Sequence, residues 1–282
     1  MFRKKTLPEQ YLHAMEDFDV RSYFQTGELP GDMPEELRAY TQKIIDACAS
    51  CAALSASGEQ RISALSEQIN PHFLYNTLDS IRSEALMAGN QPIERMTACL
   101  SRFFRYSISN PNDFVTLREE CLNLKDYFQI QSYRFGDRFS LDIEIQEPEA
   151  LEAYVPKMML QPLVENAFLH GLENKKHGGK IRVHHALTSK LLYIWVSDNG
   201  EGMSQDKVAQ LNQKLEHPDT FKPRISRHKG IALPNIQSRI RLQFGPGYGL
   251  RINSVEQKGT DVELRLPYLT MHTFQSYKKE AR

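Results

Sequence analysis

The spacing of apolar side chains changes from a helical to an alternating pattern near residue 136. Upstream of this change, from Leu37, two sets of residues recur every seven positions, which is the spacing of a coiled coil. Polar residues and Gly58 interrupt the repeat, and its most regular part runs from Ile62 to Ile69. The pattern predicts a helix that leads directly into the segment after Ile69.

Two more helices are expected in this first region. Helical spacing continues over residues 77–87, and the segment 89–92 (Gly-Asn-Gln-Pro) is expected to end that helix. A second helix is predicted over residues 93–107 and a third over 117–135, with a turn at 110–113 between them. Two antiparallel helices bury too little apolar surface alone, so we expect dimerisation into a four-helix bundle.

Apolar and polar residues alternate after Gly136, which is the pattern of half-buried strands. The expected strands cover residues 139–145, 180–187, 191–197, 249–255 and 261–266, and the expected helices cover 158–172 and 231–244. Residues 204–228 are polar and are predicted to form a mobile lid. This order of elements predicts an α/β sandwich, with helices on one face of a mixed sheet.

The composition argues against several classes of protein. Lys and Arg number 35, and Asp and Glu also number 35, so no net positive field exists to attract nucleic acid or an anionic membrane. No apolar run approaches the roughly 20 residues that span a bilayer, and no secretory signal is visible. Four cysteines in 282 residues do not form a disulfide framework, so we predict a reducing, cytoplasmic location.

Residues 68–76 read Gln-Ile-Asn-Pro-His-Phe-Leu-Tyr-Asn and place His72 in a helical context directly after Pro71. A proline inside a helix removes a hydrogen bond and bends the axis, which favours exposure of the next residue. A neutral imidazole there could attack a terminal phosphate. Taken alone, the segment favours a capped or buried histidine at a kink.

A polar stripe follows on the expected helix 158–172, where Glu165, Asn166 and His170 lie. The amide oxygen of Asn166 could complete the oxygen shell of Mg²⁺, which takes few protein ligands together with phosphates and waters. His170 lies one helical turn further and would point the same way, toward the phosphates. An ordinary amphipathic helix with a polar stripe is the competing interpretation.

Asp198 follows the expected strand 191–197 and precedes Asn-Gly-Glu-Gly-Met. A buried carboxylate at this point could accept a hydrogen bond from the exocyclic amine of adenine. Gly200 and Gly202 would let the backbone approach the base closely. Thr260, in the last hairpin, could also bond toward the adenine. A tight turn at each position is the alternative explanation.

Lys229 and Gly230 precede a helix that is expected to begin near Leu233-Pro234-Asn235. Free N–H groups at a helix start attract phosphate, and glycine lets the chain come close to it. Lys229 adds a positive charge nearby. A plain junction between a loop and a helix, with Pro234 well placed for the helix start, is the alternative.

In this order, the segments resemble the cytoplasmic kinase core of bacterial sensor histidine kinases of the LytS/YesM-like group. Residues 68–76 match the group's H-box, residues 163–171 its N-box, and residues 198–203 its first glycine box. The resemblance implies an α+β fold, in which a helical hairpin for dimerisation and phosphate acceptance precedes a Bergerat-type α/β sandwich that binds ATP.

The resemblance also implies a reaction. Mg²⁺ and ATP would be the cofactors, His72 the phosphoacceptor, and Asn166 the magnesium ligand. Nucleotide binding would fall to Asn166, His170, Asp198, Gly200, Gly202, Lys229, Gly230, Asn235 and Thr260. The phosphoryl group would pass on to an aspartate in the receiver domain of a response regulator, and Asn76 could orient water for dephosphorylating that regulator.

Two departures from the group's pattern bear on the mechanism. The second glycine box has Ala232 where the group has glycine, so we expect altered contacts in the lid. Phe73 follows the phosphoacceptor, where many histidine kinases have an acid. Glu165 is therefore the candidate for positioning the imidazole or a metal-bound water.

The predicted division of the chain has four parts. They are a linker or signal-input segment (1–60), dimerisation and histidine phosphotransfer helices (61–136), a catalytic ATP-binding domain (137–270) and a C-terminal tail (271–282). A linker at residues 135–138 would let the ATP-binding domain swing onto His72 of its own chain or of the partner in a homodimer. A membrane would be involved only through a sensor part absent from this sequence.

Two other functions stay open. A pseudokinase that acts as a dimeric signalling scaffold would explain Phe73 and Ala232. A different ATPase of the same nucleotide fold, related to gyrase, chaperones or anti-sigma serine kinases, would share the ATP-binding motifs but not the Asn-Pro-His helix.

Overall fold

The structure is a computed structural model that describes residues 71–108, 114–172, 175–216 and 232–280 of the 282-residue chain. The predicted coiled-coil repeat, the turn at 110–113, and the site residues Lys229 and Gly230 lie outside the described residues. Within the described ranges, no helix is long and apolar enough to cross a bilayer.

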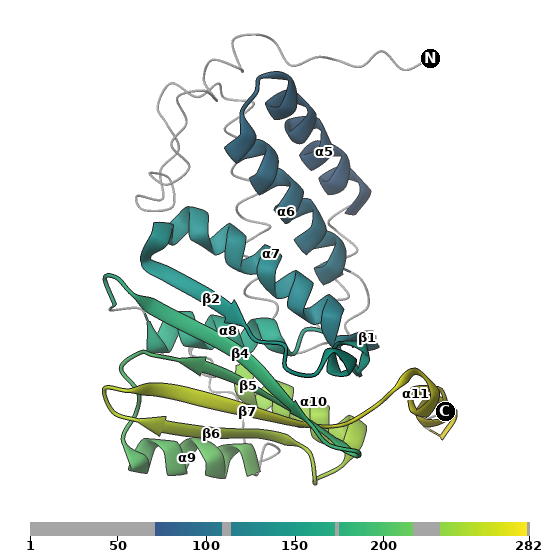
Figure 1. Ribbon diagram of the computed structural model, residues 1–282, viewed down its shortest axis with the longest axis vertical. Helices are drawn as coiled ribbons and strands as arrows, with labels where there is room; N and C mark the ends of the chain where they lie inside the picture. Colours follow the sequence, from purple (N-terminus) through teal and green to yellow (C-terminus); the bar gives the residue numbers. More distant parts are fainter. Residues whose placement is uncertain (1–70, 109–113, 173–174, 217–231, 281–282) are drawn as a thin grey trace.

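Two antiparallel helices, α5 (Pro71–Met87) and α6 (Gln91–Ile108), form the first part of the described chain (Figure 1). Asn90 caps α6, because its Oδ1 accepts the N–H of Ile93 at 3.3 Å. Gly89 follows the first helix with φ at 69°, as a helix end requires. Pro92 does not end a helix, contrary to the prediction. It lies in the first turn of α6, where a missing N–H breaks no helical hydrogen bond.

The third predicted helix, α7 (Leu117–Phe135), has the predicted bounds. A capping box fixes its start: the Thr116 hydroxyl accepts the N–H of Glu119 at 3.3 Å, and the Glu119 carboxylate accepts the N–H of Thr116 at 2.7 Å. Directly before it, β1 (Phe114–Thr116) pairs antiparallel with β3 (Tyr154–Pro156). Neither strand was predicted, because three residues are too few to show alternation.

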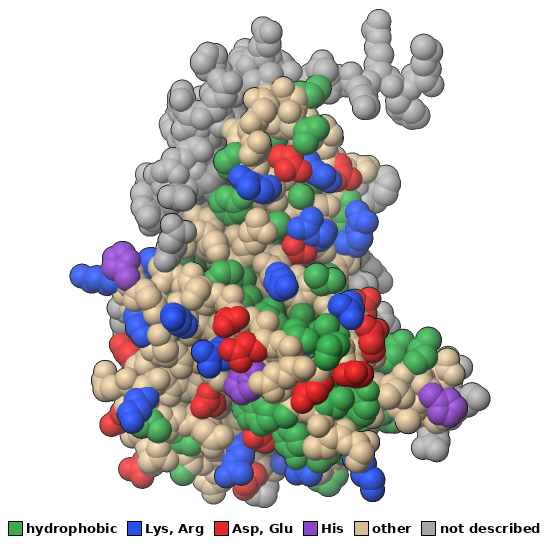
Figure 2. All heavy atoms as spheres, viewed as in Figure 1, with side chains coloured by type: hydrophobic (Ala, Val, Ile, Leu, Met, Phe, Trp, Pro, Cys, Tyr) green, Lys and Arg blue, Asp and Glu red, His purple; other side chains and the backbone are tan. Residues whose placement is uncertain are grey.

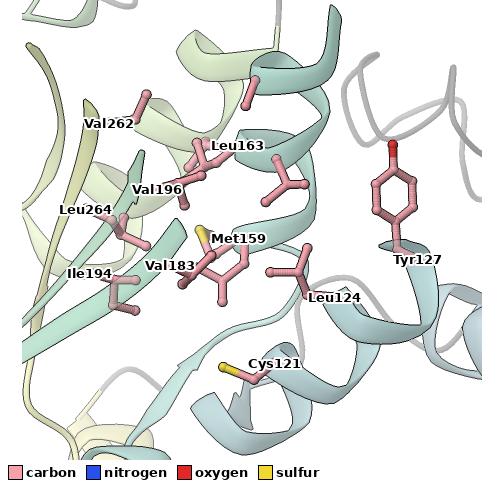
Figure 3. Close-up of a cluster of buried hydrophobic side chains, with 14 of the residues drawn as sticks. Cys121, Leu124, Tyr127, Met159, Leu163, Val183, Ile194, Val196, Val262 and Leu264 are labelled. Carbon is pink, nitrogen blue, oxygen red and sulfur yellow. The ribbon is translucent and has the colours of Figure 1, made fainter. Parts of the chain in front are cut away.

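The helix α7 packs against the second region of the chain as well as against α6. Leu124 is fully buried in the main apolar cluster (Figure 3). At the other end of the helix, Phe135 stacks on Phe168 with ring centroids 5.9 Å apart, and Phe139 meets the same ring at 5.4 Å. The connection at residues 135–138 is therefore packed against the second region, and the swing of the ATP-binding domain about it stays a prediction.

The second region is built on a five-stranded mixed sheet (Figure 1). Its order is β2-β4-β5-β7-β6, in which β2 pairs parallel with β4 and the other pairs are antiparallel. The strands are β2 (Phe139–Ile143), β4 (Gly179–Leu187), β5 (Leu191–Asp198), β6 (Gly249–Val255) and β7 (Gly259–Pro267). All five were predicted, and the alternation misplaced their ends by two residues at most.

Helices cover one face of this sheet (Figure 1). They include α8 (Leu160–Asn166), which continues into a π-helical turn (Ala167–Gly171), and α10 (Ala232–Phe244). Figure 3 shows apolar side chains of the strands and of α8 meeting in the core, among them Met159, Leu163, Val183, Ile194, Val196 and Leu264. A helical part followed by an α/β sandwich is the predicted fold class, which is confirmed.

One helix occupies a segment in which none was predicted. The helix α9 (Gln205–Glu216) lies in the segment 204–228, so the prediction of a mobile lid was wrong for these residues. Val208, Leu211 and Leu215 follow helical spacing on it, but they stand among polar residues in a segment whose overall period is weak. The rest of that segment lies outside the described residues.

The C-terminal segment, predicted as a tail, contains the helix α11 (Met271–Glu280). Phe274 is buried and stacks on Tyr154 of β3, with ring centroids 4.4 Å apart. Phe114 of β1 also lies against the Phe274 ring, with ring centroids 4.9 Å apart. The helix is thus packed against the small sheet of β1 and β3.

Amide side chains cover the outer edge of β6, which ends the sheet. They come from Gln205 and Asn212 on α9 and from Gln237 on α10. Asn212 bonds both outward groups of Ile252, donating to its C=O at 2.8 Å and accepting its N–H at 2.9 Å. These contacts occupy backbone groups that a bare edge strand would offer to another chain.

The uncovered face of the sheet is polar and aromatic. Trp195 stacks on His184 and Tyr193, with ring centroids 5.1 and 5.7 Å apart, and its Nε1 donates to Glu263 at 3.1 Å. Figure 2 shows acidic and basic side chains interspersed over the same side of the molecule.

Replacing Leu124 with Ala is expected to lower the free energy of unfolding by about 2–5 kcal/mol, because it leaves a cavity in a packed cluster. Leu122→Ala on the same helix is the matched control, since that side chain is 55% exposed. We expect it to change stability by no more than about 0.5 kcal/mol. Urea denaturation measures both, and equal costs would contradict the packing of α7 onto the sandwich.

Candidate functional site

The helix α8 carries Glu165 and Asn166, and its start is held by a carboxylate from α7. Glu120 accepts the N–H groups of the three residues Met158, Met159 and Leu160 at 2.6, 2.9 and 2.9 Å. The helix begins at Leu160 and not at Met158 as predicted, because Met158 has φ at 60°, in the left-handed region. The first turn of α8 is therefore set by contacts with α7.

Asn166 is half-buried at the end of α8. Its Nδ2 donates to the C=O of Pro162 at 3.0 Å, so the Oδ1 oxygen is the group that can meet a cation. No group of three or more His, Cys, Asp or Glu side chains that could hold a metal occurs among the described residues. One amide oxygen fits Mg²⁺ only if phosphates and waters complete its shell.

Glu165 lies at the end of a line of buried amides. Asn123 of α7 donates to the Oε1 of Gln161 at 3.3 Å, and the Nε2 of Gln161 donates to Glu165 at 2.8 Å. Burial raises the pKa of Glu165 to about 7, and the hydrogen bond from Gln161 opposes this shift. The carboxyl group is thus held in one orientation beside Asn166.

His170 lies in the π-helical turn that follows Asn166, and its side chain is exposed. Single π-helical turns inside α-helices are frequent at functional sites. The prediction treated residues 158–172 as one regular helix, so it missed this turn.

Asp198 and Thr260 are brought together at the end of β5. They are direct partners in the register of β5 and β7, and the Asp198 carboxylate accepts the N–H of Gly200 at 2.8 Å. Burial raises the pKa of Asp198, whereas backbone hydrogen bonds from Gly200 and Thr260 lower it. The Oγ of Ser254 lies 3.0 Å from the Oγ1 of Thr260 and accepts the N–H of Met203 at 2.9 Å.

The two glycines of the first glycine box lie against other parts of the protein backbone. A Cβ on Gly200 would lie 2.0 Å from the carbonyl oxygen of Gly171, and one on Gly202 would lie 2.0 Å from that of Val255. Gly202 also has φ at 66°. Packing within the protein therefore requires glycine at both positions, and their approach to a nucleotide stays a prediction.

Gly171 was included in the N-box but not among the predicted binding residues. A Cβ there would lie 2.6 Å from the Oδ1 of Asp198. The signal was its position at the end of the expected helix, directly after His170. Its partner Asp198 is far away in the sequence, so the contact could not be inferred.

The remaining predicted site residues are less completely described. Asn235 is half-buried in the first turn of α10, and Ala232 is the first residue of that helix. His72 is the second residue of α5, and the predicted bend at Pro71 depends on residues outside the described part of the chain. Asn76 is exposed on the same helix. The structure does not bring α5 into the group formed by Asn166 and Asp198.

Two family models match the sequence. The model of the histidine kinase family matches residues 60–139, and the model of the histidine kinase-, DNA gyrase B- and HSP90-like ATPases matches residues 155–270. Between them they cover most of the described structure. The first match includes α5, α6 and α7, and the second includes the α8 helix and most of the sheet.

Curated proteins with similar sequences are sensor kinases. The sensor histidine kinase YesM of Bacillus subtilis is 37% identical over 74% of this chain and 33% of its own length. The sensor protein LytS of Staphylococcus saprophyticus is 30% identical over 79% of this chain and 36% of its own, and the sensor histidine kinase BtsS of Escherichia coli is 28% identical over 74% and 34%. The chain spans about a third of the length of these relatives.

A solved structure with some likeness is the histidine kinase domain of the Erythrobacter litoralis EL346 blue-light activated histidine kinase. It is 15% identical, with a TM-score of 0.39, over 79% of this chain and 99% of that chain. This score is too low to support an argument.

Gly200→Ala is expected to lower the free energy of unfolding by about 1–3 kcal/mol, because the new methyl group meets backbone that cannot move aside. Gly247→Ala is the matched control, since a Cβ there would meet no atom within 4 Å. We expect the control to stay within about 0.5 kcal/mol of the parent protein. Thermal or urea unfolding measures both, and an unchanged Gly200 variant would contradict the close contact with Gly171.

Proposed function

This chain belongs to the histidine kinase family of the LytS and YesM type, and we propose that it is the phosphotransfer core of a two-component sensor kinase. In this proposal it transfers the γ-phosphoryl group of ATP to its own His72 and then to an aspartate of a response regulator. The matched segments, 60–139 and 155–270, supply the two parts that the reaction needs, an acceptor helix and an ATP-binding fold.

The observation that carries the proposal is the contact between the end of the α8 segment and the end of β5. The N–H of Glu201 donates to the C=O of Gly171 at 3.1 Å, and Gly171 lies against the carboxylate of Asp198. This contact places the helix with Asn166 next to the strand end with Asp198. One nucleotide could then extend from its base at Asp198 to its phosphates at Asn166.

Each site residue has a role in this proposal. Asp198, with Thr260 beside it, accepts the adenine amine, and the Oδ1 of Asn166 faces the metal-bound phosphates. Magnesium, when bound, neutralises charge that develops on the phosphates. Lys229, Gly230, Asn235 and His170 complete the phosphate site.

The transfer exchanges one bond to phosphorus for another. A ring nitrogen of His72 forms the new N–P bond, the bond from phosphorus to the bridging oxygen breaks, and ADP leaves with that electron pair. The chain supplies the geometry of this in-line exchange. We assign to Glu165 the positioning of the imidazole or of a metal-bound water, because Gln161 fixes its carboxyl group beside Asn166.

The partners follow from the same reaction. We propose a homodimer built on the α5–α6 hairpin, a receiver domain as phosphate acceptor, and a cytoplasmic location for this part of the protein. Asn76 is exposed one turn after His72, where it could orient water during dephosphorylation of the regulator. An Asn76→Ala variant with intact phosphatase activity would end that assignment.

The two competing functions are less well supported. The match of residues 60–139 to the histidine kinase family favours a histidine acceptor over the serine kinases and ATPases that share the nucleotide fold. A pseudokinase scaffold would keep dimerisation without phosphate transfer. The next measurement separates all three.

Incubation with radiolabelled ATP and Mg²⁺ is expected to label the protein with acid-labile phosphate, as a phosphoramidate requires. His72→Ala should abolish the label, because it removes the attacking nitrogen. His177→Ala is the control, since His177 is exposed and lies outside the proposed site. Acid-stable label, or label that persists without His72, would reject the proposal, and binding of ATP without any label would favour the scaffold.

Glu165→Gln is expected to slow autophosphorylation by about 100-fold or more, the range of a lost acid–base or positioning group, with little change in ATP affinity. Glu144→Gln, which removes a carboxylate that pairs with Arg182 after β2 and outside the proposed site, should leave both quantities unchanged. Single-turnover labelling and equilibrium binding of a fluorescent ATP analogue measure the two effects. Equal losses of rate and affinity would remove Glu165 from this role.

A further inference from the structure

A buried carboxylate lies where the helical hairpin meets the helix that carries Asn166. Glu120 of α7 is 1% exposed. Besides the three N–H groups at the start of α8, it accepts a hydrogen bond from the Tyr106 hydroxyl of α6. One side chain therefore joins α6, α7 and α8.

The backbone that Glu120 holds is strained. Met158 has a positive φ, which a side chain of this size rarely adopts and which persists only where neighbouring contacts fix it. Glu120 bonds its N–H, and the Nη2 of Arg239 on α10 donates to the C=O groups of Lys157 and Met158 at 2.6 and 3.2 Å. The turn before α8 is thus held from α7 on one side and from α10 on the other.

Tyr106 makes a second contact with the same turn. The Nζ of Lys157 lies 4.9 Å from the centre of the Tyr106 ring, and Lys157 is itself fully buried. Burial and the nearby Glu120 raise the pKa of Tyr106, so the hydroxyl stays protonated and donates. A displacement of α6 must therefore disturb the contacts that fix the start of α8.

The turn before α8 can affect the nucleotide site because only the seven-residue helix α8 separates it from Asn166. Asn166 ends a helix that begins at Leu160, so a rotation of the first turn is passed on to the amide through rigid helix. Asn123, one turn after Glu120 on α7, steadies the same helix through Gln161. Both ties come from the same face of α7.

We propose that Glu120 is a positioning residue for the nucleotide site, and that Tyr106 is the contact through which the α5–α6 hairpin acts on that site. This inference rests on the proposed function, because it takes Asn166 as the ligand of the nucleotide-bound magnesium. It assigns no contact with the nucleotide to either residue.

The first measurement is the affinity for a non-hydrolysable ATP analogue with and without Mg²⁺. Glu120→Gln replaces two hydrogen-bond acceptors by one, so we expect the gain in affinity that Mg²⁺ provides to fall by about tenfold or more. Affinity without Mg²⁺ should change by no more than about twofold. Asp126→Asn, which removes another α7 carboxylate facing α6 at the partly exposed pair with Arg102, is the control and should match the parent protein.

The second measurement is hydrogen exchange of the α6 amides around Tyr106, with and without the magnesium–nucleotide complex. The parent protein should show a change in protection there when the complex binds. Tyr106→Phe keeps the ring and all three bonds from Glu120 to α8, so it should bind the complex with affinity changed by no more than about threefold but lose the response in α6.

Two results would overturn the inference. A Glu120→Gln variant that melts at a lower temperature but keeps the full effect of Mg²⁺ would make Glu120 a purely structural residue. A Tyr106→Phe variant with an undiminished response in α6 would exclude Tyr106 as the contact. If Glu120→Gln does not fold, Glu120→Asp retains the charge at a shorter reach and should show a smaller loss of the Mg²⁺ effect.

Failure of the proposed function would look different. Both measurements use a nucleotide that cannot donate phosphate, and they can be repeated in a His72→Ala background. Absence of phosphotransfer together with a reduced Mg²⁺ effect in Glu120→Gln would reject the kinase reaction and support the positioning role.

Discussion

The placement of α8 is the constraint on which the site depends. This helix has seven residues before its π-helical turn, and a helix so short has no stability of its own in water. Its two ends are therefore fixed from outside, by Glu120 at the start and by the approach of Gly171 to Asp198 at the end. The orientation of Asn166 is set by elements that come before and after it in the chain.

The longer elements of the fold could be predicted because each contains enough residues for its side-chain period to be visible. The third helix was predicted with its observed bounds, and the five strands to within two residues. The strands β1 and β3 were missed because three residues are too few to show alternation, and α9 was missed because its few apolar residues stand in a largely polar segment. The packing of the connection at 135–138 was not predicted, because stacking of Phe135 and Phe139 on Phe168 is a tertiary contact that local sequence does not reveal.

The site residues also divide into those that could be predicted and those that could not. Asp198 and Thr260 were each singled out from a turn at a strand end, but their pairing joins β5 and β7, which are about 60 residues apart and form no hairpin with each other. Glu120, Asn123 and Gln161 were not singled out. Each is a polar residue on a helix and resembles a solvated one until its partner, about 40 residues away, is known. Buried polar residues with distant partners are what periodicity cannot detect.

The amides that cover the edge of β6 bear on whether the sheets of two copies of this chain can pair edge to edge. Partners in a dimer are held at a high effective concentration, at which bare strand edges would tend to pair and join two sheets into one. Along β6 the bonds from Asn212 and Gln237 already occupy backbone groups, so in the proposed dimer this edge would not pair with the partner's sheet. Amide side chains on the neighbouring helices thus leave this edge of the sheet few free backbone groups for pairing with another chain.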